Sequence, residues 1–316
     1  MQQTRQWMVT HRWMVEPMPQ TEWIERRGVL VWIAEVFTSL GAGLYLVSLF
    51  LNSWEGALVA WLIISFLKVP IHIAYFGKPL RFWRTIPPFS GAWRTSWFCR
   101  GIVFTILFTG FAFLQLVTSY LVINGVIAGS AMNALVVVDI LFKVLGGLFA
   151  LMTGIYGGFI MSYCKSVPFW NTGLLPIVFI VAGVADGLAL VMAIGLGVGG
   201  VDIGAVESAS RFLLIINALL IGTYLLTATY QSVIAKLSTT ELIVGHVAVA
   251  FWVGIVLFGI LIPIVISIVS IFTGKATASL LLVVAIASHT LGAFALKYCL
   301  LKVGIHRPIL PKASAY

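Results

Sequence analysis

The chain alternates long apolar runs with short polar links. Eight runs hold about 20 or more mostly apolar residues each, at 29–51, 57–76, 101–123, 134–162, 172–197, 211–233, 242–272 and 278–300. A hydrocarbon core about 30 Å thick needs about 20 such residues for one helical span. The pattern therefore predicts an all-α integral membrane protein with eight transmembrane helices, and it leaves too little chain for a folded extramembrane domain.

Composition supports this class. Of 316 residues, 61% are hydrophobic and only 9% are charged, and the mean hydropathy is +1.08, which excludes an ordinary soluble domain. The three cysteines, Cys99, Cys164 and Cys299, are far apart and form no C-x-x-C pair. We therefore expect free thiols, and neither an iron–sulfur cluster nor a structural zinc site within this protein.

Lysine and arginine are concentrated on one side of the expected membrane. The side that holds the N-terminus carries Arg5, Arg12, Arg26, Arg27, Lys78, Arg81, Arg84, Arg94, Arg100, Lys165, Lys236, Lys302, Arg307 and Lys312. The opposite side offers Lys275 and, at a helix start, Arg211. Cytoplasmic loops carry the positive excess, so both termini are predicted to be cytoplasmic. Because topology alone produces such a bias, the net charge of +9 gives no reason to expect a nucleic-acid partner.

Residues 1–28 have no apolar core or small-residue cleavage site, so we expect a polar cytoplasmic arm rather than a signal peptide. Its tryptophans and arginines are compatible with two alternatives. The arm is either a disordered tail or an amphipathic segment lying on the membrane surface or against a partner.

Two motif blocks carry a family resemblance. The segments GKPLRFWR (77–84) and RTSWFCRG (94–101) resemble the GKP-x-RFW and TSW-x-x-RG block of the NrfD/PsrC-type, DmsC-like membrane subunits of respiratory molybdo- and tungstoenzymes. Residues 152–190, which contain MTG and PFWN, are similar to a second block of that family. Weaker matches extend over the rest of the sequence, including LKYCLLKVGIHRP (296–308), where the family more often has Arg than Lys297.

The resemblance implies two four-helix bundles: a quinone-binding bundle at 29–162 and a second bundle at 163–300, followed by a tail at 301–316. It implies menaquinone or ubiquinone as cofactor, with no haem or metal in this protein. It also implies a ferredoxin-like [4Fe–4S] partner subunit and, beyond it, a molybdenum or tungsten bis-pterin catalytic subunit, in a bacterial or archaeal cytoplasmic membrane. This subunit would exchange electrons between the quinone pool and the nearest cluster.

Three ionisable side chains lie at similar depth in the first two expected spans. Glu35 lies about two turns into the first, and Lys68 and His72 share one face of the second because residues four apart align on a helix. Charged groups inside a membrane are costly and often functional, and Glu and His can exchange protons with a quinone. Alternatives remain: a Glu35–Lys68 pair that only fastens two helices, an interface role for His72, and a Lys68 that snorkels to the surface.

A fourth candidate comes from a departure within the second block. The family's YTG has Met152 in place of its tyrosine, so any hydrogen bond from that tyrosine to the quinone is lost here. Tyr156, one turn later, is the expected substitute.

Three further charged residues are candidates for a proton path. Asp139 and Lys143 are four residues apart on the fourth span, where opposite charges stabilise each other. Asp186 lies near the middle of the fifth span without a local counterion. A structural pair, for the first two, and a neutral hydrogen-bonded carboxyl, for the third, are the alternatives.

The link at 77–100 is long for a protein with such short connections elsewhere, and it is rich in arginine and tryptophan. Long loops are often functional, and these residues dominate protein interfaces. We therefore expect a docking platform for the iron–sulfur partner made by Lys78, Arg81, Trp83, Arg84, Arg94, Trp97 and Arg100. Charge topology and an interfacial aromatic belt explain part of this pattern without a partner.

Two other functions remain open. Three histidines fall in expected spans, His72, His246 and His289, so a haem-b-type cytochrome subunit is one alternative, although two haems need two histidine pairs. A proton or small-solute transporter is the other.

Overall fold

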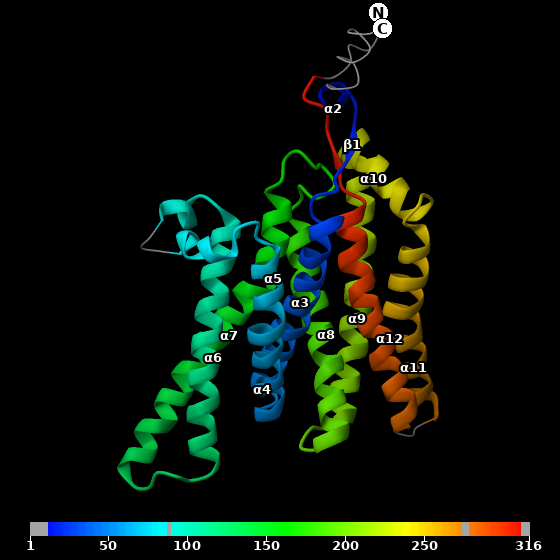
Figure 1. Ribbon diagram of the computed structural model, residues 1–316. Helices are drawn as coiled ribbons and strands as arrows, with labels where there is room; N and C mark the ends of the chain where they lie inside the picture. Colours follow the sequence, from blue (N-terminus) through cyan, green and yellow to red (C-terminus); the bar gives the residue numbers. More distant parts are fainter. Residues whose placement is uncertain (1–11, 87–89, 274–277, 311–316) are drawn as a thin grey trace, which may run out of the picture.

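The computed structural model describes residues 12–86, 90–273 and 278–310. Within this part, eight helical segments are long and apolar enough to cross a membrane, which confirms the predicted fold class (Figure 1). The spans are α3 (Val29–Phe50), α4 with η2 and α5 (Trp54–Leu62, Ile63–Lys68 and Val69–Tyr75), α6 (Trp97–Ile123), α7 (Ser130–Ser162), α8 (Leu174–Val198), α9 (Ile203–Gln231), η5 with α11 (Ala250–Leu261 and Ile262–Thr273), and α12 (Ser279–Lys302). The segments η2 and η5 are π-helical.

Short elements lie at the end of the bundle where α3 begins and α12 ends (Figure 1). They are α2 (Arg12–Val15), β1 (Met18–Pro19), the 3-10 turns η1 (Arg26–Gly28), η3 (Pro79–Thr85) and η4 (Gly91–Arg94), α10 (Val233–Ile243), and β2 (Ile305–His306). The strands β1 and β2 pair antiparallel, with Met18 opposite His306.

Two predicted boundaries are wrong. The sixth span begins at Ile203 rather than 211, because Asp202 caps the helix by accepting a 3.1 Å hydrogen bond from the Ala205 amide. Arg211 therefore lies two turns inside α9, not at a helix start. The seventh span begins at Ala250 rather than 242, because the polypeptide first forms the separate helix α10.

The break before the seventh span also changes the place of His246. Its side chain is exposed and pairs with Glu241 at 2.8 Å outside the span. The prediction that His246 lies in a membrane span, on which the haem alternative partly rested, is therefore wrong.

The helices pack around a central pair, α3 and α8, with α6 and α7 on one side and α9, η5, α11 and α12 on the other (Figure 1). One apolar cluster lies mainly in the C-terminal half, around Trp170 and Tyr224. A second joins α3, α4, α6, α7 and α8 with Leu282 and Ile286 of α12. Because the second cluster includes residues of both halves, the division into two four-helix bundles stays a prediction.

Glycines set how closely α3 and α8 approach. A Cβ on Gly43 would collide with the Gly183 carbonyl oxygen, and a Cβ on Gly187 would collide with the Gly43 backbone. Small residues allow such contact between membrane helices, where apolar surface alone gives no drive to associate. This contact holds together the two helices that carry Glu35 and Asp186.

We expect Gly43→Ala to destabilise the protein by about 1–3 kcal/mol, because the added methyl forces two packed backbones apart. Gly110→Ala is the matched control, since it lies within α6 with open space around it and should gain about 0.5–1 kcal/mol from better helix propensity. Thermal unfolding of the purified variants in detergent measures both changes. Equal unfolding temperatures for the two would contradict the proposed contact.

Candidate functional site

A segment that we call the N-terminal strap, residues 18–28, crosses the charged end of the bundle. Its first two residues, Met18 and Pro19, form β1, which pairs with β2. Next to them, the Gln20 backbone N–H donates to the Gly304 carbonyl at 2.8 Å. The Gln20 side chain donates to the Leu301 carbonyl, and Lys302 pairs with Glu25 at 2.7 Å. The strap is therefore tied to the end of α12 at several points.

Tryptophan packing fixes the middle of the strap. The ring of Trp23 stacks on Trp170 with centroids 5.2 Å apart, and the Trp170 indole donates to the Leu300 carbonyl at 2.7 Å. Trp170 belongs to the PFWN motif between α7 and α8, and it is 1% exposed. This motif therefore has a structural role, because it links the strap to the core.

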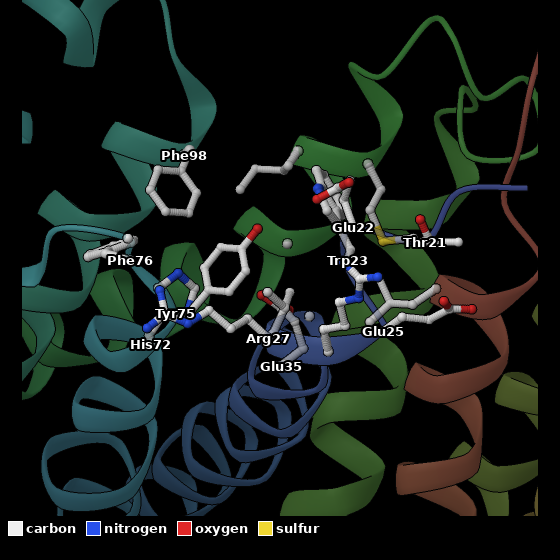
Figure 2. A pocket seen from close by; sticks show the side chains of 18 residues that line it. Thr21, Glu22, Trp23, Glu25, Arg27, Glu35, His72, Tyr75, Phe76 and Phe98 are labelled. Carbon is white, nitrogen blue, oxygen red and sulfur yellow. The ribbon is translucent and has the colours of Figure 1, made fainter. Parts of the chain in front are cut away.

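Beneath the strap lies a cavity of about 830 Å³. Its walls combine the strap with the end of α5, the start of α6 and parts of α3 and α7. Figure 2 shows His72, Tyr75, Phe76 and Phe98 on one side, Thr21, Glu22, Trp23 and Glu25 on the other, and Glu35 between them. The volume falls within the range usual for small-molecule sites.

Glu35 is buried on the cavity wall and is flanked by positive charge. Its side chain is 8% exposed, and the charges of Lys297 and Lys68 both act on it. The Tyr156 hydroxyl is within hydrogen-bonding reach of the carboxylate. Burying a carboxylate without such partners would be very costly, so these residues allow Glu35 to remain at the cavity.

Lys68 and Tyr156 lie behind Glu35 rather than on the cavity wall. The Lys68 ammonium donates to Thr105 Oγ1 at 2.8 Å and lies 5.2 Å from the centre of the Tyr156 ring. Since Lys68 is 3% exposed, the snorkelling alternative is wrong. The close fit also involves the glycine of the RTSWFCRG block, because a Cβ on Gly101 would strike the Tyr156 ring.

His72 forms the opposite wall. Its ring stacks on Phe98, with centroids 5.5 Å apart at an angle of 30°, and lies edge-on to Phe76. The Nδ1 atom is buried and has no hydrogen-bond partner among the described residues. A buried polar atom without a partner costs free energy, so this nitrogen is suited to an acceptor or donor on a ligand. Of the residues that the sequence suggested for this site, Glu35 and His72 line the cavity, whereas Lys68 and Tyr156 do not; their role in quinone binding stays a prediction.

The candidates for a proton path fall into two separate places. Asp139 pairs with Lys143 at 3.0 Å and accepts bonds from Thr118 and Ser119 at 2.9 and 2.5 Å. This group borders a cavity of about 180 Å³ at the end away from the strap. Asp186, by contrast, lies 3.1 Å from His289 Nε2 and accepts a 2.7 Å bond from Ser39.

The expected docking residues divide by exposure. Lys78, Arg81, Trp83, Arg84 and Arg94 are exposed, whereas Trp97 and Arg100 are partly buried in the first turn of α6. Trp97 stacks on Phe159 at 4.6 Å, and Arg100 donates to the Trp93 and Arg94 carbonyls at 3.0 and 2.5 Å. These two residues therefore hold the loop on the bundle.

Sequence reasoning missed two buried charges. Lys297 sits near Glu35, and its position within the last apolar run was the available signal. Glu207 was missed because the sixth span was predicted to begin at 211, which placed this residue in the preceding link. In the structure Glu207 lies inside α9 and is 7% exposed. The three cysteines are free thiols, as predicted.

The fold and the site define a polytopic helical membrane protein that has, at one end, a cavity lined by charged residues and covered by the N-terminal strap. The family model described as "Polysulphide reductase, NrfD" matches residues 28–308, so the chain belongs to the NrfD family. Membership supports a membrane subunit of a respiratory oxidoreductase. The sequence is also 27% identical over 125 residues to the C subunit of polysulfide reductase from Wolinella succinogenes. That alignment covers 38% of this protein and spans 39% of the relative.

We expect Glu35→Gln to destabilise the protein by roughly 3–5 kcal/mol, because it leaves buried lysine charge uncompensated. Adding Lys68→Met to that variant should recover part of the loss. Glu55→Gln, on the exposed first turn of α4, serves as the control and should change little. Thermal unfolding reports all three; a Glu35→Gln protein as stable as the parent would refute the electrostatic account.

Proposed function

We propose that this protein is the quinone-binding membrane anchor of a respiratory oxidoreductase, exchanging electrons between menaquinone or ubiquinone and an iron–sulfur partner subunit. One observation carries the proposal. Glu35 and His72, on different spans, line the same cavity of about 830 Å³ in a member of the NrfD family. A quinone bound there would carry two electrons and two protons.

The residues present fit such a head group. The unpartnered His72 Nδ1 offers a hydrogen bond to a carbonyl or hydroxyl oxygen, and Phe76 and Phe98 supply a flat apolar wall for a ring. Glu35 provides a second polar contact on the same cavity. Apolar surface with a few placed polar groups is typical of cofactor sites.

Each residue then has a distinct task. His72 orients the head group and exchanges a proton at one oxygen. Glu35 accepts or releases the other proton, while Lys68 and Lys297 stabilise its anionic form. Tyr156 lies behind Glu35 and holds the carboxylate in place, so it acts as a positioning residue rather than as a direct replacement for the tyrosine absent at Met152. The strap and the aromatic side chains limit the access of water.

We expect His72→Phe to weaken binding of decylubiquinone about 3- to 10-fold, since it keeps the aromatic packing but removes one hydrogen bond. Quenching of tryptophan fluorescence in the purified protein measures the affinity, because Trp23 lies on the cavity wall. His246→Gln is the matched control on the exposed surface and should bind normally. Unchanged affinity in His72→Phe would reject the assignment of the cavity.

The exposed cations of the 77–100 link are the proposed docking surface for the ferredoxin-like [4Fe–4S] subunit, which would connect to a molybdenum or tungsten bis-pterin subunit. Lys78 directly follows Gly77 on the cavity wall, so a partner docked there would lie next to the cavity. With a positive-inside orientation, this end and both termini are proposed to face the cytoplasm of a bacterial or archaeal cell.

We expect the double variant Arg81→Glu, Arg84→Glu to lose most of the iron–sulfur protein that copurifies with the tagged subunit, because charge reversal at an interface costs several kcal/mol. Lys236→Glu is the control, since it reverses an exposed charge on α10 at the same end of the bundle. Iron content and subunit composition of the purified complex give the readout. Equal recovery in both variants would place the partner elsewhere.

A further inference from the structure

A line of ionisable side chains, all buried except Arg211 at its end, continues from the cavity through the C-terminal half of the molecule. Its members lie on α3, α12, α8 and α9, and α8 packs against each of the other three. In order they are Glu35, Lys297, Asp186, His289, Glu207 and Arg211. The tasks proposed at the cavity use only the first two, so the remaining groups need another explanation.

The first step joins the cavity to Lys297. A Cβ placed on Gly157 would meet both the Glu35 carboxylate and the edge of the Phe179 ring, so these groups adjoin one another. The Lys297 ammonium lies 3.3 Å from the centre of that ring. Lys297 is 3% exposed, and the charges of Glu35 and Asp186 both act on it.

The second step is the pair of Asp186 and His289. Asp186 Oδ1 lies 3.1 Å from His289 Nε2, and His289 Nδ1 lies 3.1 Å from the Gly259 carbonyl of the π-helical segment η5. Both ring nitrogens thus face oxygen atoms. The contact between Nε2 and Asp186 lacks hydrogen-bond geometry. With Nδ1–H donating to the Gly259 carbonyl, the Nε2 atom of a neutral imidazole, which carries only one N–H, can take up a proton beside the carboxylate. Such an arrangement can hold and release a proton.

The third step leads toward the opposite end of the bundle. His289, Glu207, Ser267 and Arg211 line a small cavity of about 20 Å³, which is large enough for about one water molecule. Ser267 donates to Glu207 at 3.1 Å, and Arg211 donates to Ser267 at 2.7 Å. Arg211 is partly exposed, and α9 begins two turns earlier at Ile203.

The N-terminal half shows no equivalent line within the described residues. Lys68 bonds to Thr105, and Gln115, further along α6, belongs to the Asp139 cluster. Between them, Phe108 and Ala112 are fully buried in the apolar cluster. Among the described residues, no buried acidic, basic or imidazole side chain therefore connects Asp139 and Lys143 to the cavity.

We propose that Lys297, Asp186, His289 and Glu207 conduct protons between the cavity and the opposite face of the membrane. The proposal rests on the proposed function only for the source of the protons: oxidation of one quinol at the cavity gives up two electrons and two protons, and reduction takes up the same number. The competing explanation is that the Asp186–His289 pair only fastens α8 to α12.

The test uses no quinone and no partner, so its failure is distinct from a failure of the proposed function. The full-length protein is reconstituted into liposomes that contain the pH dye pyranine, and a potassium gradient with valinomycin drives proton movement. We expect proton flux clearly above that of protein-free liposomes. Asp186→Asn should lower this flux by at least about tenfold, as expected when a proton-transfer group is lost.

Asp139→Asn is the matched control, because it removes a buried acid that lies off the line, and it should conduct as the parent protein does. Glu207→Gln provides a second variant on the line, in case Asp186→Asn fails to fold, and it should also lose flux. Thermal unfolding checks that each variant is intact. Flux no greater than in protein-free liposomes, or equal flux in the parent protein, folded Asp186→Asn and Glu207→Gln, would overturn the proposal.

Discussion

The cost of placing charge within a membrane is the constraint on which the rest of this structure depends. Glu35 is buried at the cavity wall, and a carboxylate in such a place is tolerated only with compensating groups. Lys68 and Lys297 supply that compensation from spans far apart in sequence. Because the lysines come from η2 and α12, the same electrostatic requirement joins both halves of the protein at one point.

The helix α3, which carries Glu35, packs against both α8 and α12. Trp32 donates to the Phe294 carbonyl of α12 at 2.9 Å, and Ser39 donates to Asp186 of α8 at 2.7 Å. Between them, Glu35 faces the cavity. One turn beyond Ser39, Gly43 allows the backbone of α8 to approach closely. Successive turns of one helix therefore set the distance between the cavity and the buried Asp186–His289 pair.

The limits of sequence reasoning follow from what each signal measures. Hydropathy located the eight spans, and the helical repeat placed Lys68 and His72 on one face at the depth of Glu35. Neither signal reports which distant helix is adjacent, so Lys297 was not joined to Glu35. For the same reason no partner was assigned to Asp186, since His289 is far from it in sequence. Glu207 was missed because a polar helix start, capped by Asp202, resembles a loop.

The distribution of charge gives the molecule two unlike ends. At the strap end, the link that carries the exposed arginines continues directly from the cavity wall at Gly77. A partner bound to those arginines would therefore be close to Glu35 and His72, while protons and electrons could leave the cavity in different directions. Electrons would pass outward to the partner through the polar end. In the proposed proton path, the buried groups of α8, α9 and α12 would carry protons the other way, and such a separation would let the membrane store energy from the redox reaction.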